Sequence, residues 1–318
     1  MRLGIHLPVV DSEGHALTAG EVMHRARTIE AAGFNSVWLG DHIIGRPDAL
    51  MMLLLAAAAT DHLEVGTAIL QVPLRNPVEL AQRFLTLQAL TRGRFSVGVG
   101  SGSAQRSFDA IGEGDRFEQR FKLLHRDLQK IQALCRGETV DGTNLLPLPE
   151  ARGGPPIIIG AWVSGEWVKR AAREYDGWMA SGGRTNLRNL ATGIKRYRAA
   201  GGKRAMVATI LVDLSLPERS LDEEATELRG DLRALGHGYA PDRGVTLLCG
   251  PKSASERLHH LADMGFDDAL LVKRNASHVY GDLTEQDLCS IRSLIEPDTS
   301  RPFAATNLSP QARERSIT

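Results

Sequence analysis

Short apolar segments alternate with stretches of helical spacing along most of the chain, and this alternation limits the folds that are open to it. The apolar segments are residues 2–8, 36–40, 63–70, 94–100, 155–160, 177–181, 204–214 and 268–272. The stretches with apolar residues three and four apart follow at 18–32, 49–59, 77–91, 116–135, 164–174, 187–200, 222–235 and 253–264. Short apolar runs of this kind are typical of buried parallel strands. Eight strands, each followed by a helix, predict an α/β fold of the (β/α)8 (TIM) barrel type, which needs about 250 residues.

The domain organisation follows from the same pattern. A doubly wound sheet would use fewer strands and would leave the carboxyl-terminal part of the chain needing a separate domain, yet no linker marks its beginning. We therefore expect one barrel domain over residues 1–296, with a longer excursion between the fourth and fifth strands. Residues 137–154 in that excursion are predicted to form a small hairpin or lid. Residues 297–318 are polar and lack periodicity, which predicts a flexible tail.

Composition excludes several classes of partner. Lys+Arg and Asp+Glu both number 38, so the chain lacks the basic charge that nucleic-acid binding needs. The three cysteines are far apart and have no metal-ligand spacing, which predicts reduced thiols and no metal. The amino terminus lacks a signal peptide, and the apolar run at 49–59 is too short to span a bilayer. We expect a cytoplasmic protein with a small-molecule substrate and no membrane partner.

The stretch SVWLGDH places a polar pair, Asp41 and His42, where the second predicted strand ends. In a (β/α)8 barrel the carboxyl ends of the strands carry the active site. A histidine there can donate to a cofactor or substrate oxygen, or exchange a proton near neutral pH. The alternative is that Asp41 caps a helix and His42 only fills space.

Two further strand ends have features that suit a ring. Ala68 is small and precedes Ile69 at the end of the third strand, so a flat ring could approach the backbone there. The alternative is a buried strand with a proline-rich exit. The run GVGSGS at 98–103 is spaced GxGxG and no helix follows promptly, so it does not predict a dinucleotide-binding loop. Its glycine-rich backbone can still press against a phosphate or an aromatic ring.

The fifth strand leads through Gly160, Ser164 and Gly165 into a helix. The free N–H groups at the start of that helix would suit an anion. An ordinary capped helix is the alternative reading.

Taken together, these stretches resemble the bacterial luciferase-like superfamily of flavin- and deazaflavin-dependent oxidoreductases. The resemblance reaches to about residue 295 and rests on residues 30–42, 63–102, 108–112, 116–120, 155–178 and 250–272. It implies a barrel that holds a flavin ring at its carboxyl mouth, over a bulge with a non-prolyl cis peptide at Ala68-Ile69. It also implies that Asp41 and His42 lie near the reactive edge of the ring.

The resemblance further implies a site for the cofactor phosphate. The residues concerned are those of the fifth-strand turn and its neighbour on the fourth strand: Gly160, Ala161, Ser164, Gly165, Gly100 and Ser101. Two departures from the family pattern occur. Luciferase looks to have an arginine where this chain has Ser101, and many relatives carry an acidic residue where this chain has Arg106-Ser107.

The function expected from the resemblance is a two-component monooxygenase that uses reduced FMN, supplied by a separate flavin reductase, and O2 on a small organic substrate. The alternative is hydride transfer with the deazaflavin coenzyme F-420 and no oxygen. A non-catalytic flavin-binding barrel is an alternative of another class. Lys273, at the end of the last strand, keeps open a lyase or aldolase without flavin. A homodimer through the apolar second and third helices is also expected from the resemblance.

Overall fold

The computed structural model describes residues 1–162, 165–182, 185–218, 247–274 and 283–295. Their contacts form two compact units. The first comprises residues 1–71, 96–100 and the described part of 156–297, and the second comprises residues 72–95 and 101–155. The single domain of residues 1–296 therefore stays a prediction. The predicted helix at 222–235 and the predicted tail at 297–318 lie outside the described residues.

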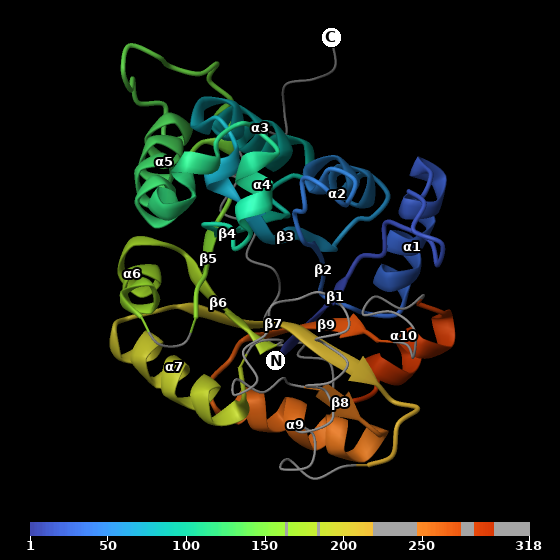
Figure 1. Cartoon of the computed structure of the whole chain (residues 1–318). Coiled ribbons are helices and arrows are strands. Elements are labelled where there is room, and N and C mark those ends of the chain that lie inside the picture. Colours follow the sequence, from blue (N-terminus) through green and yellow to red (C-terminus); the bar gives the residue numbers. More distant parts are fainter. Residues whose placement is uncertain (163–164, 183–184, 219–246, 275–282, 296–318) are drawn as a thin grey trace. The chain divides into compact units, whose positions relative to one another are not determined.

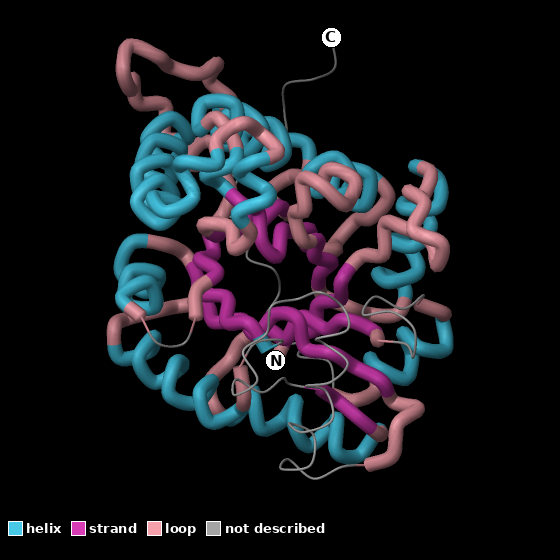
Figure 2. Tube along the Cα trace, in the orientation of Figure 1, coloured by secondary structure: helices cyan, strands magenta, loops and turns pink. Residues whose placement is uncertain are grey.

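The first unit contains a closed parallel barrel of eight strands, seen as a ring of magenta segments in Figure 2. The ring comprises β1 (Arg2–His6), β2 (Ser36–Leu39), β3 (Glu64–Gln71), β4 (Phe95–Gly100), β5 (Ile157–Gly160), β6 (Gly177–Ser181), β7 (Arg204–Asp213) and β9 (Asp268–Lys273). The first seven pair in chain order, and β9 closes the ring by pairing with both β1 and β7. The structure thus confirms the predicted fold class and all eight strands.

Helices of the first unit lie outside the ring (Figure 1). They are α1 (Ala19–Ala31), α2 (Ala49–Ala58), α6 (Glu166–Glu174), α7 (Leu187–Ala199), α9 (Pro251–Asp263) and α10 (Glu285–Arg292). Local sequence explains where α1 begins and ends. Thr18 and Glu21 form a reciprocal capping box, and Gly33 follows the helix with a φ of 83°.

Two elements of this unit were not predicted. The strand β8 (Leu247–Cys249) pairs only with the end of β7, outside the ring, and three residues are too few to give a pattern. The helix α10 does have a sequence signal, because Thr284 and Asp287 form a capping box before buried Leu288 and Ile291.

A carboxylate on α1 positions the chain at the start of β3. Glu30 Oε1 accepts hydrogen bonds from the backbone N–H groups of Asp61, His62 and Leu63, at 3.1, 2.7 and 2.9 Å. These three donors directly precede the strand. The side chain of Glu30 therefore connects α1 to the entry of β3 through these backbone groups.

The second unit is helical. It contains η1 (Val72–Leu74), α3 (Pro77–Leu90), α4 (Gln105–Asp109), η2 (Gly114–Gln119), α5 (Arg120–Cys135) and η3 (Pro149–Ala151). The predicted helix at 116–135 is thus a 3-10 turn followed by α5. Within the predicted excursion, Val140 and Thr143 exchange backbone hydrogen bonds of 2.8 and 2.9 Å across Asp141 and Gly142. Both turn residues have positive φ, as a two-residue type I′ hairpin requires, so the predicted small hairpin is present.

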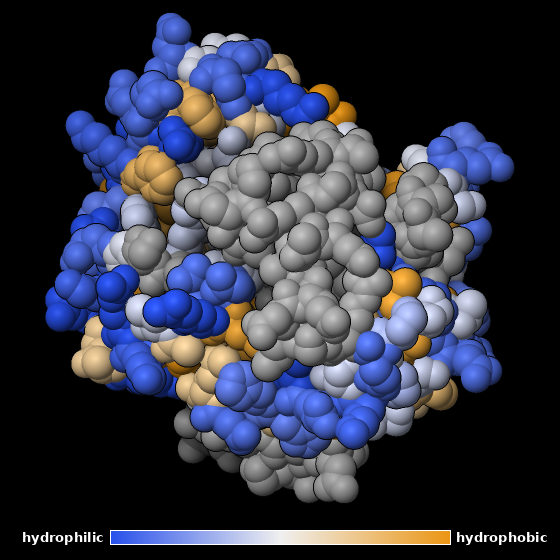
Figure 3. All heavy atoms as spheres, turned by 60° about the horizontal axis from the view of Figure 1, so that its bottom comes forward, coloured by the Kyte–Doolittle hydropathy of each residue, from blue (hydrophilic) through white to orange (hydrophobic). Residues whose placement is uncertain are grey.

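The surface of the described residues is mainly hydrophilic on the face that Figure 3 shows, with apolar side chains in small groups. Large apolar side chains that are exposed occur in both units: Ile43, Ile44, Met51, Leu90, Phe121, Leu146 and Trp162. None of the described helices is long and apolar enough to cross a bilayer.

Trp38 contributes the largest side chain of a cluster buried among the barrel strands. Its ring lies against Gly66, where a Cβ atom would come within 2.3 Å of it, and its Nε1–H donates to Ser36 Oγ at 2.8 Å. The other members come from β5, β6, β7 and β9: Ile158, Met179, Met206, Ala208 and Leu270. Gly66 is therefore needed because the indole fills the space that a side chain would take.

Charged side chains meet where β1, β3, β7 and β9 begin. Arg204 donates to both carboxylate oxygens of Glu64, at 2.8 and 3.1 Å, and to both oxygens of Asp268, at 2.9 Å each. Arg2 donates to Glu64 at 2.5 Å, and Ser96 Oγ–H donates to it at 2.6 Å. Burial alone would raise the pKa of the Glu64 carboxyl, but Arg204 and Arg2 outweigh burial and lower that pKa to about 2.

Removing the Glu64 charge is expected to destabilise the barrel strongly. The substitution Glu64→Gln leaves Arg204, which is largely buried, with one carboxylate in place of two, and breaking a buried pair from one side costs about 3–5 kcal/mol. Denaturation with urea at pH 7 measures the free energy of unfolding. The matched control is Glu79→Gln, which breaks an exposed pair with Arg83 and should cost about 1 kcal/mol or less. Equal losses in the two variants would contradict this assignment.

The same pair sets a pH dependence. Because the folded-state pKa of Glu64 lies below its ordinary 4.5, its contribution to stability is present above pH 4.5 and is lost as the pH falls toward 2. The Glu64→Gln variant should lack this part of the acid sensitivity.

Candidate active site

Asp41 joins the end of β2 to the end of β3. It is only 4% exposed, and its backbone N–H donates to the Ile69 carbonyl oxygen at 3.2 Å. Its Oδ2 accepts from the Gln71 N–H at 3.1 Å, while Gln71 Nε2–H donates to the Asp41 carbonyl oxygen at 2.8 Å. The N-cap of α2 is Asp48, so the helix-capping alternative for Asp41 is wrong. Asp41 holds the backbone on both sides of Leu70 in place.

His42 is exposed beside the same strand end. A Cβ atom added at Gly40 would lie 3.4 Å from His42 Nε2 and 3.5 Å from the Ala68 carbonyl oxygen. The His42 carbonyl oxygen accepts from the N–H groups of Gly45 and Arg46, at 3.1 and 3.2 Å, which makes residues 42–46 a tight turn. The imidazole of His42 therefore lies close to Gly40, near the backbone of Ala68.

The peptide bond between Ala68 and Ile69 is cis, as the resemblance predicts. Both side chains are partly exposed, and both pack on the cluster around Trp38. A Cβ atom at Gly100 would come within 2.0 Å of Ile69 Cδ1, and one at Gly160 within 2.8 Å of Ile69 Cγ2. The structure thus brings together Ala68, Ile69, Gly100 and Gly160 at the carboxyl ends of β3, β4 and β5.

Packing within the barrel explains the glycines of β4. A Cβ atom at Gly98 would come within 2.1 Å of the Thr67 carbonyl oxygen, and Thr67 Oγ1–H donates to the Gly98 carbonyl oxygen at 2.8 Å. Gly100 makes room for Ile69. Ser101 begins a segment of the second unit, and its Oγ–H donates to the Gly102 carbonyl oxygen at 3.3 Å. Contact of Gly100 or Ser101 with a cofactor stays a prediction.

The connection from β5 to α6 holds the remaining predicted phosphate residues. The Ala161 N–H donates to the Met179 carbonyl oxygen at 3.2 Å, and the Ala161 carbonyl oxygen accepts from Trp178 Nε1–H at 3.0 Å. Gly165 is the N-cap of α6 and has no side chain that could cap it. Ser164 lies outside the described residues. A phosphate-binding role for Gly160, Ala161 and Gly165 also stays a prediction.

His6 lies near the candidate site and was not among the predicted site residues. It ends β1, is 8% exposed, and lies opposite Trp38 in the pairing of β1 with β2. Burial, and then the nearby charges of Arg46 and His42, lower the pKa of His6 to about 3, so its imidazole is neutral at pH 7. The available signal was a polar residue at the carboxyl end of an otherwise apolar first strand. Gln71 could have been found in the same way, since it ends β3.

Other features carry less weight. Among the described residues no group of three His, Cys, Asp or Glu side chains could hold a metal ion. Lys273 Nζ–H donates to Asp287 Oδ2, so this amine is held in an ion pair.

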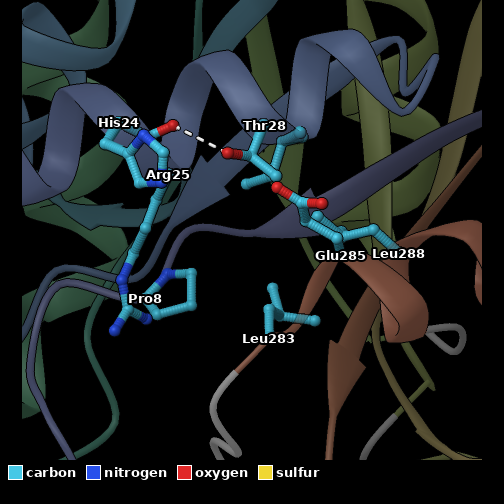
Figure 4. Close-up of a pocket in the computed structure, with 8 residues that line it drawn as sticks. Pro8, His24, Arg25, Thr28, Leu283, Glu285 and Leu288 are labelled. Carbon is cyan, nitrogen blue, oxygen red and sulfur yellow. Dashed lines mark hydrogen bonds between the residues drawn. The ribbon is translucent and has the colours of Figure 1, made fainter.

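A separate cavity of about 170 Å³ lies between α1 and α10 (Figure 4). The residues that line it include none of the predicted site residues: Pro8, His24, Arg25, Thr28, Ile29, Leu283, Glu285 and Leu288.

The sequence matches the family described as luciferase-like monooxygenase over residues 1–279. The chain belongs to this family. Curated relatives include an F420-dependent glucose-6-phosphate dehydrogenase of Nocardia farcinica, 31% identical over 52% of this chain and 54% of that protein. The protein of the same name from Mycolicibacterium smegmatis is 28% identical over 65% of this chain and 67% of that protein. The chain thus spans about half to two thirds of the length of these relatives.

Solved structures of low sequence identity share the fold. An F420-dependent secondary alcohol dehydrogenase superimposes with a TM-score of 0.69 at 17% identity, over 92% of this chain and 98% of that one. The oxygenating constituent of 3,6-diketocamphane monooxygenase from Pseudomonas putida, solved with FMN, gives a TM-score of 0.65 at 16% identity, over 85% of this chain and 91% of that one. The barrel is therefore of the luciferase-like type.

The contact between Ile69 and Gly100 predicts that substitutions at these two positions have coupled effects on the free energy of unfolding. Gly100→Ala should destabilise the protein by about 1–3 kcal/mol, because the new methyl group overlaps Ile69 Cδ1. Ile69→Val removes that carbon, so the double variant should be more stable than the sum of the single losses predicts. Free energies of unfolding for the four proteins of this cycle test the coupling. Gly20→Ala, at a position with open space, is the control for adding a methyl group. Strict additivity of the two changes would contradict the contact.

The buried neutral His6 predicts a second pH effect. Its folded-state pKa of about 3 lies below the ordinary 6.5, so unfolding takes up one proton between these values. The stability contribution is full above pH 6.5 and falls by about 1.4 kcal/mol per pH unit as the pH drops toward 3. Unfolding free energies from pH 7.5 to 4.5 should show a slope that His6→Gln removes. A His6 NMR signal that titrates between pH 5 and 8 in the folded protein would overturn this account.

Proposed function

We propose that this chain transfers hydride between a small alcohol or its carbonyl product and a deazaflavin coenzyme of the F420 type. The observation that carries the proposal is the similarity in sequence to F420-dependent glucose-6-phosphate dehydrogenases, which reaches 31% identity over 184 residues. A structural neighbour that is an F420-dependent secondary alcohol dehydrogenase supports the same coenzyme. These similarities favour the deazaflavin over FMN, the reverse of the order that the sequence alone suggested.

The residues at the carboxyl ends of β1, β2 and β3 fit a flat tricyclic ring. Ala68 and Ile69 present a partly exposed apolar surface, which the hydrogen bonds of Asp41 and Gln71 hold in position. His42 lies beside this surface and adds polar groups at its edge. An apolar face with a polar edge is the chemistry that a flavin or a deazaflavin ring requires.

In this proposal the chain's own residues orient the reactants and move one proton. Bound F420 supplies a ring carbon that accepts or returns a hydride. His42, exposed and close to the Ala68 backbone, takes the proton of the substrate hydroxyl as the hydride leaves the carbon that bears it. Asp41 is a positioning residue, because its hydrogen bonds are made to the backbone of Ile69 and to Gln71.

A second candidate function is the FMN-dependent monooxygenase. The family description and the FMN-containing structural neighbour favour it. It would need reduced FMN from a separate reductase, together with O2. A flavin-binding protein without catalysis would bind the coenzyme and turn over no substrate.

Calorimetric titration of the full chain with F420, with FMN and, without oxygen, with reduced FMN distinguishes these candidates. Preference for F420, followed by loss of its 420 nm absorbance when alcohols are added, is the expected result. Tight binding of reduced FMN, with oxygen uptake once a reductase is supplied, would favour the monooxygenase. Binding of none of the three would overturn both.

Replacing His42 should reduce turnover far more than binding. His42→Gln keeps a polar side chain but cannot exchange a proton, and losing an acid or base costs about 10² to 10⁴ in rate. We expect kcat to fall by that factor while the Kd for F420 changes only a few-fold. His62→Gln is the matched control, because His62 is an exposed histidine at the start of β3, the opposite end of the strand. Equal kcat in the two variants would exclude His42 as the proton acceptor.

A further inference from the structure

Thr209 departs from the regular conformation of its strand. It lies within β7 and has a φ of 61°, in the left-handed region. This conformation is rare and costly for a β-branched residue such as threonine. Residues in such conformations persist only where the surrounding structure enforces them, and they are concentrated at functional sites. The position of the Thr209 side chain in the barrel is therefore informative.

A β-bulge in β7 decides which way Thr209 faces. In the pairing of β7 with β9, the register shifts between Val207 and Ile210. These two residues pair with the residues on either side of Leu270, which share one face of β9 because side chains alternate along a strand. Ala208 and Thr209 lie between them, so both are left opposite Leu270 on the other face.

That face is the inside of the ring. Leu270 and Ala208 belong to the cluster that is buried among the barrel strands. Ala68 and Ile69 of the candidate site pack on the same cluster. Thr209 is one residue nearer the carboxyl end of β7 and is partly exposed, whereas Ala208 is only 4% exposed. Among the described residues none is hydrogen-bonded to the Thr209 hydroxyl. The bulge thus brings a hydroxyl to the inner side of the barrel mouth.

This hydroxyl lies across the ring from the candidate site. The strands β3 and β7 are opposite each other, because β4, β5 and β6 separate them on one side and β2, β1 and β9 on the other. A flat coenzyme that lies on Ala68 and Ile69 would therefore turn its other face toward β7. A substrate has to lie on that face to exchange a hydride with the ring. Both strands belong to the first unit.

We propose that the Thr209 hydroxyl hydrogen-bonds a second oxygen of the substrate, so that this chain prefers a diol to the alcohol that lacks the second hydroxyl. The inference rests on the proposed function, since it requires hydride transfer to a ring over Ala68 and Ile69. His42 follows β2 and takes the reacting hydroxyl, so a hydroxyl on β7 meets a different oxygen. The bulge fixes the backbone of Thr209, which prepares its side chain for such a contact.

Oxidation of two matched alcohols by the full chain with F420 tests this contact. 2,5-Hexanediol differs from 2-hexanol by one hydroxyl, and the loss of absorbance at 420 nm follows both reactions. We expect kcat/KM to be about tenfold higher for the diol, the factor that one hydrogen bond of ordinary strength contributes. Its second reactive position alone would give a factor of only about two.

Variants of Thr209 separate the hydroxyl from the shape of the side chain. Thr209→Val keeps the β-branched shape without the hydroxyl. It should remove the diol preference and leave kcat/KM for 2-hexanol and the Kd for F420 within about twofold. Thr209→Ser keeps a hydroxyl and should keep the preference. Thr192→Val is the matched control, because the Thr192 hydroxyl donates to the Arg188 carbonyl oxygen within α7, at 3.1 Å.

Unfolding in urea gives an independent readout of the backbone. Glycine adopts a positive φ without steric cost, so Thr209→Gly should raise the urea midpoint while it removes the diol preference. A Thr209→Gly variant that is less stable and equally selective would overturn the inference, because the threonine would then serve packing alone.

The outcomes separate this inference from the proposed function. If F420 binds and alcohols are oxidised, but without a preference for the diol or with a preference that Thr209→Val retains, only the role of Thr209 is overturned. If F420 does not bind, or no alcohol reduces it, the proposed function fails and this inference fails with it.

Discussion

Arg204 makes four hydrogen bonds to two carboxylates, and the closed barrel depends on them. Its guanidinium connects Glu64 on β3 with Asp268 on β9, two strands that do not pair with each other. A buried guanidinium would be costly without such partners, and so would either carboxylate without the arginine. The chain begins at the same place, where Arg2 reaches Glu64. The charges that stabilise the barrel thus lie at the amino ends of the strands. The carboxyl ends can then carry other polar groups without a loss of this network.

Further along the barrel, large side chains on some strands fill the space beside glycines on other strands. Trp38 fills the space beside Gly66, and Ile69 fills the space beside Gly100 and Gly160. A large side chain on one strand is thus matched by glycine on other strands of the ring, so packing alone explains these glycines. What reaches the mouth of the barrel is a small apolar surface, Ala68 and Ile69, beside the exposed imidazole of His42. The proposed hydride transfer would need this kind of support for a flat ring, together with one group that can exchange a proton.

The fold could be read from the sequence because each strand of the closed ring left a local signature. Apolar runs and helical spacing depend on near neighbours, and so do caps such as Thr18 with Glu21. The candidate site was reached only in part. Asp41 and His42 were predicted from their place after a strand, but the two bonds between Asp41 and Gln71 join residues thirty apart in the chain and leave no local pattern. His6 was missed because a histidine in a short apolar strand looks like any other, and only burial and the charges of Arg46 and His42 make it distinctive. The sequence also could not separate FMN from F420, since both rings make the same demands on the barrel.

Glu30 accepts hydrogen bonds from the backbone N–H groups of residues 61–63. Every amino acid except proline has the same backbone N–H donor. These hydrogen bonds therefore constrain the length and path of the loop at residues 61–63, but not which amino acids occupy it. Substitutions at Asp61 and His62 should therefore leave these hydrogen bonds intact. One substitution at a position distant in sequence, Glu30 on α1, would remove the acceptor of all three. A change at Glu30 is therefore expected to disturb this loop more than a change at Asp61 or His62.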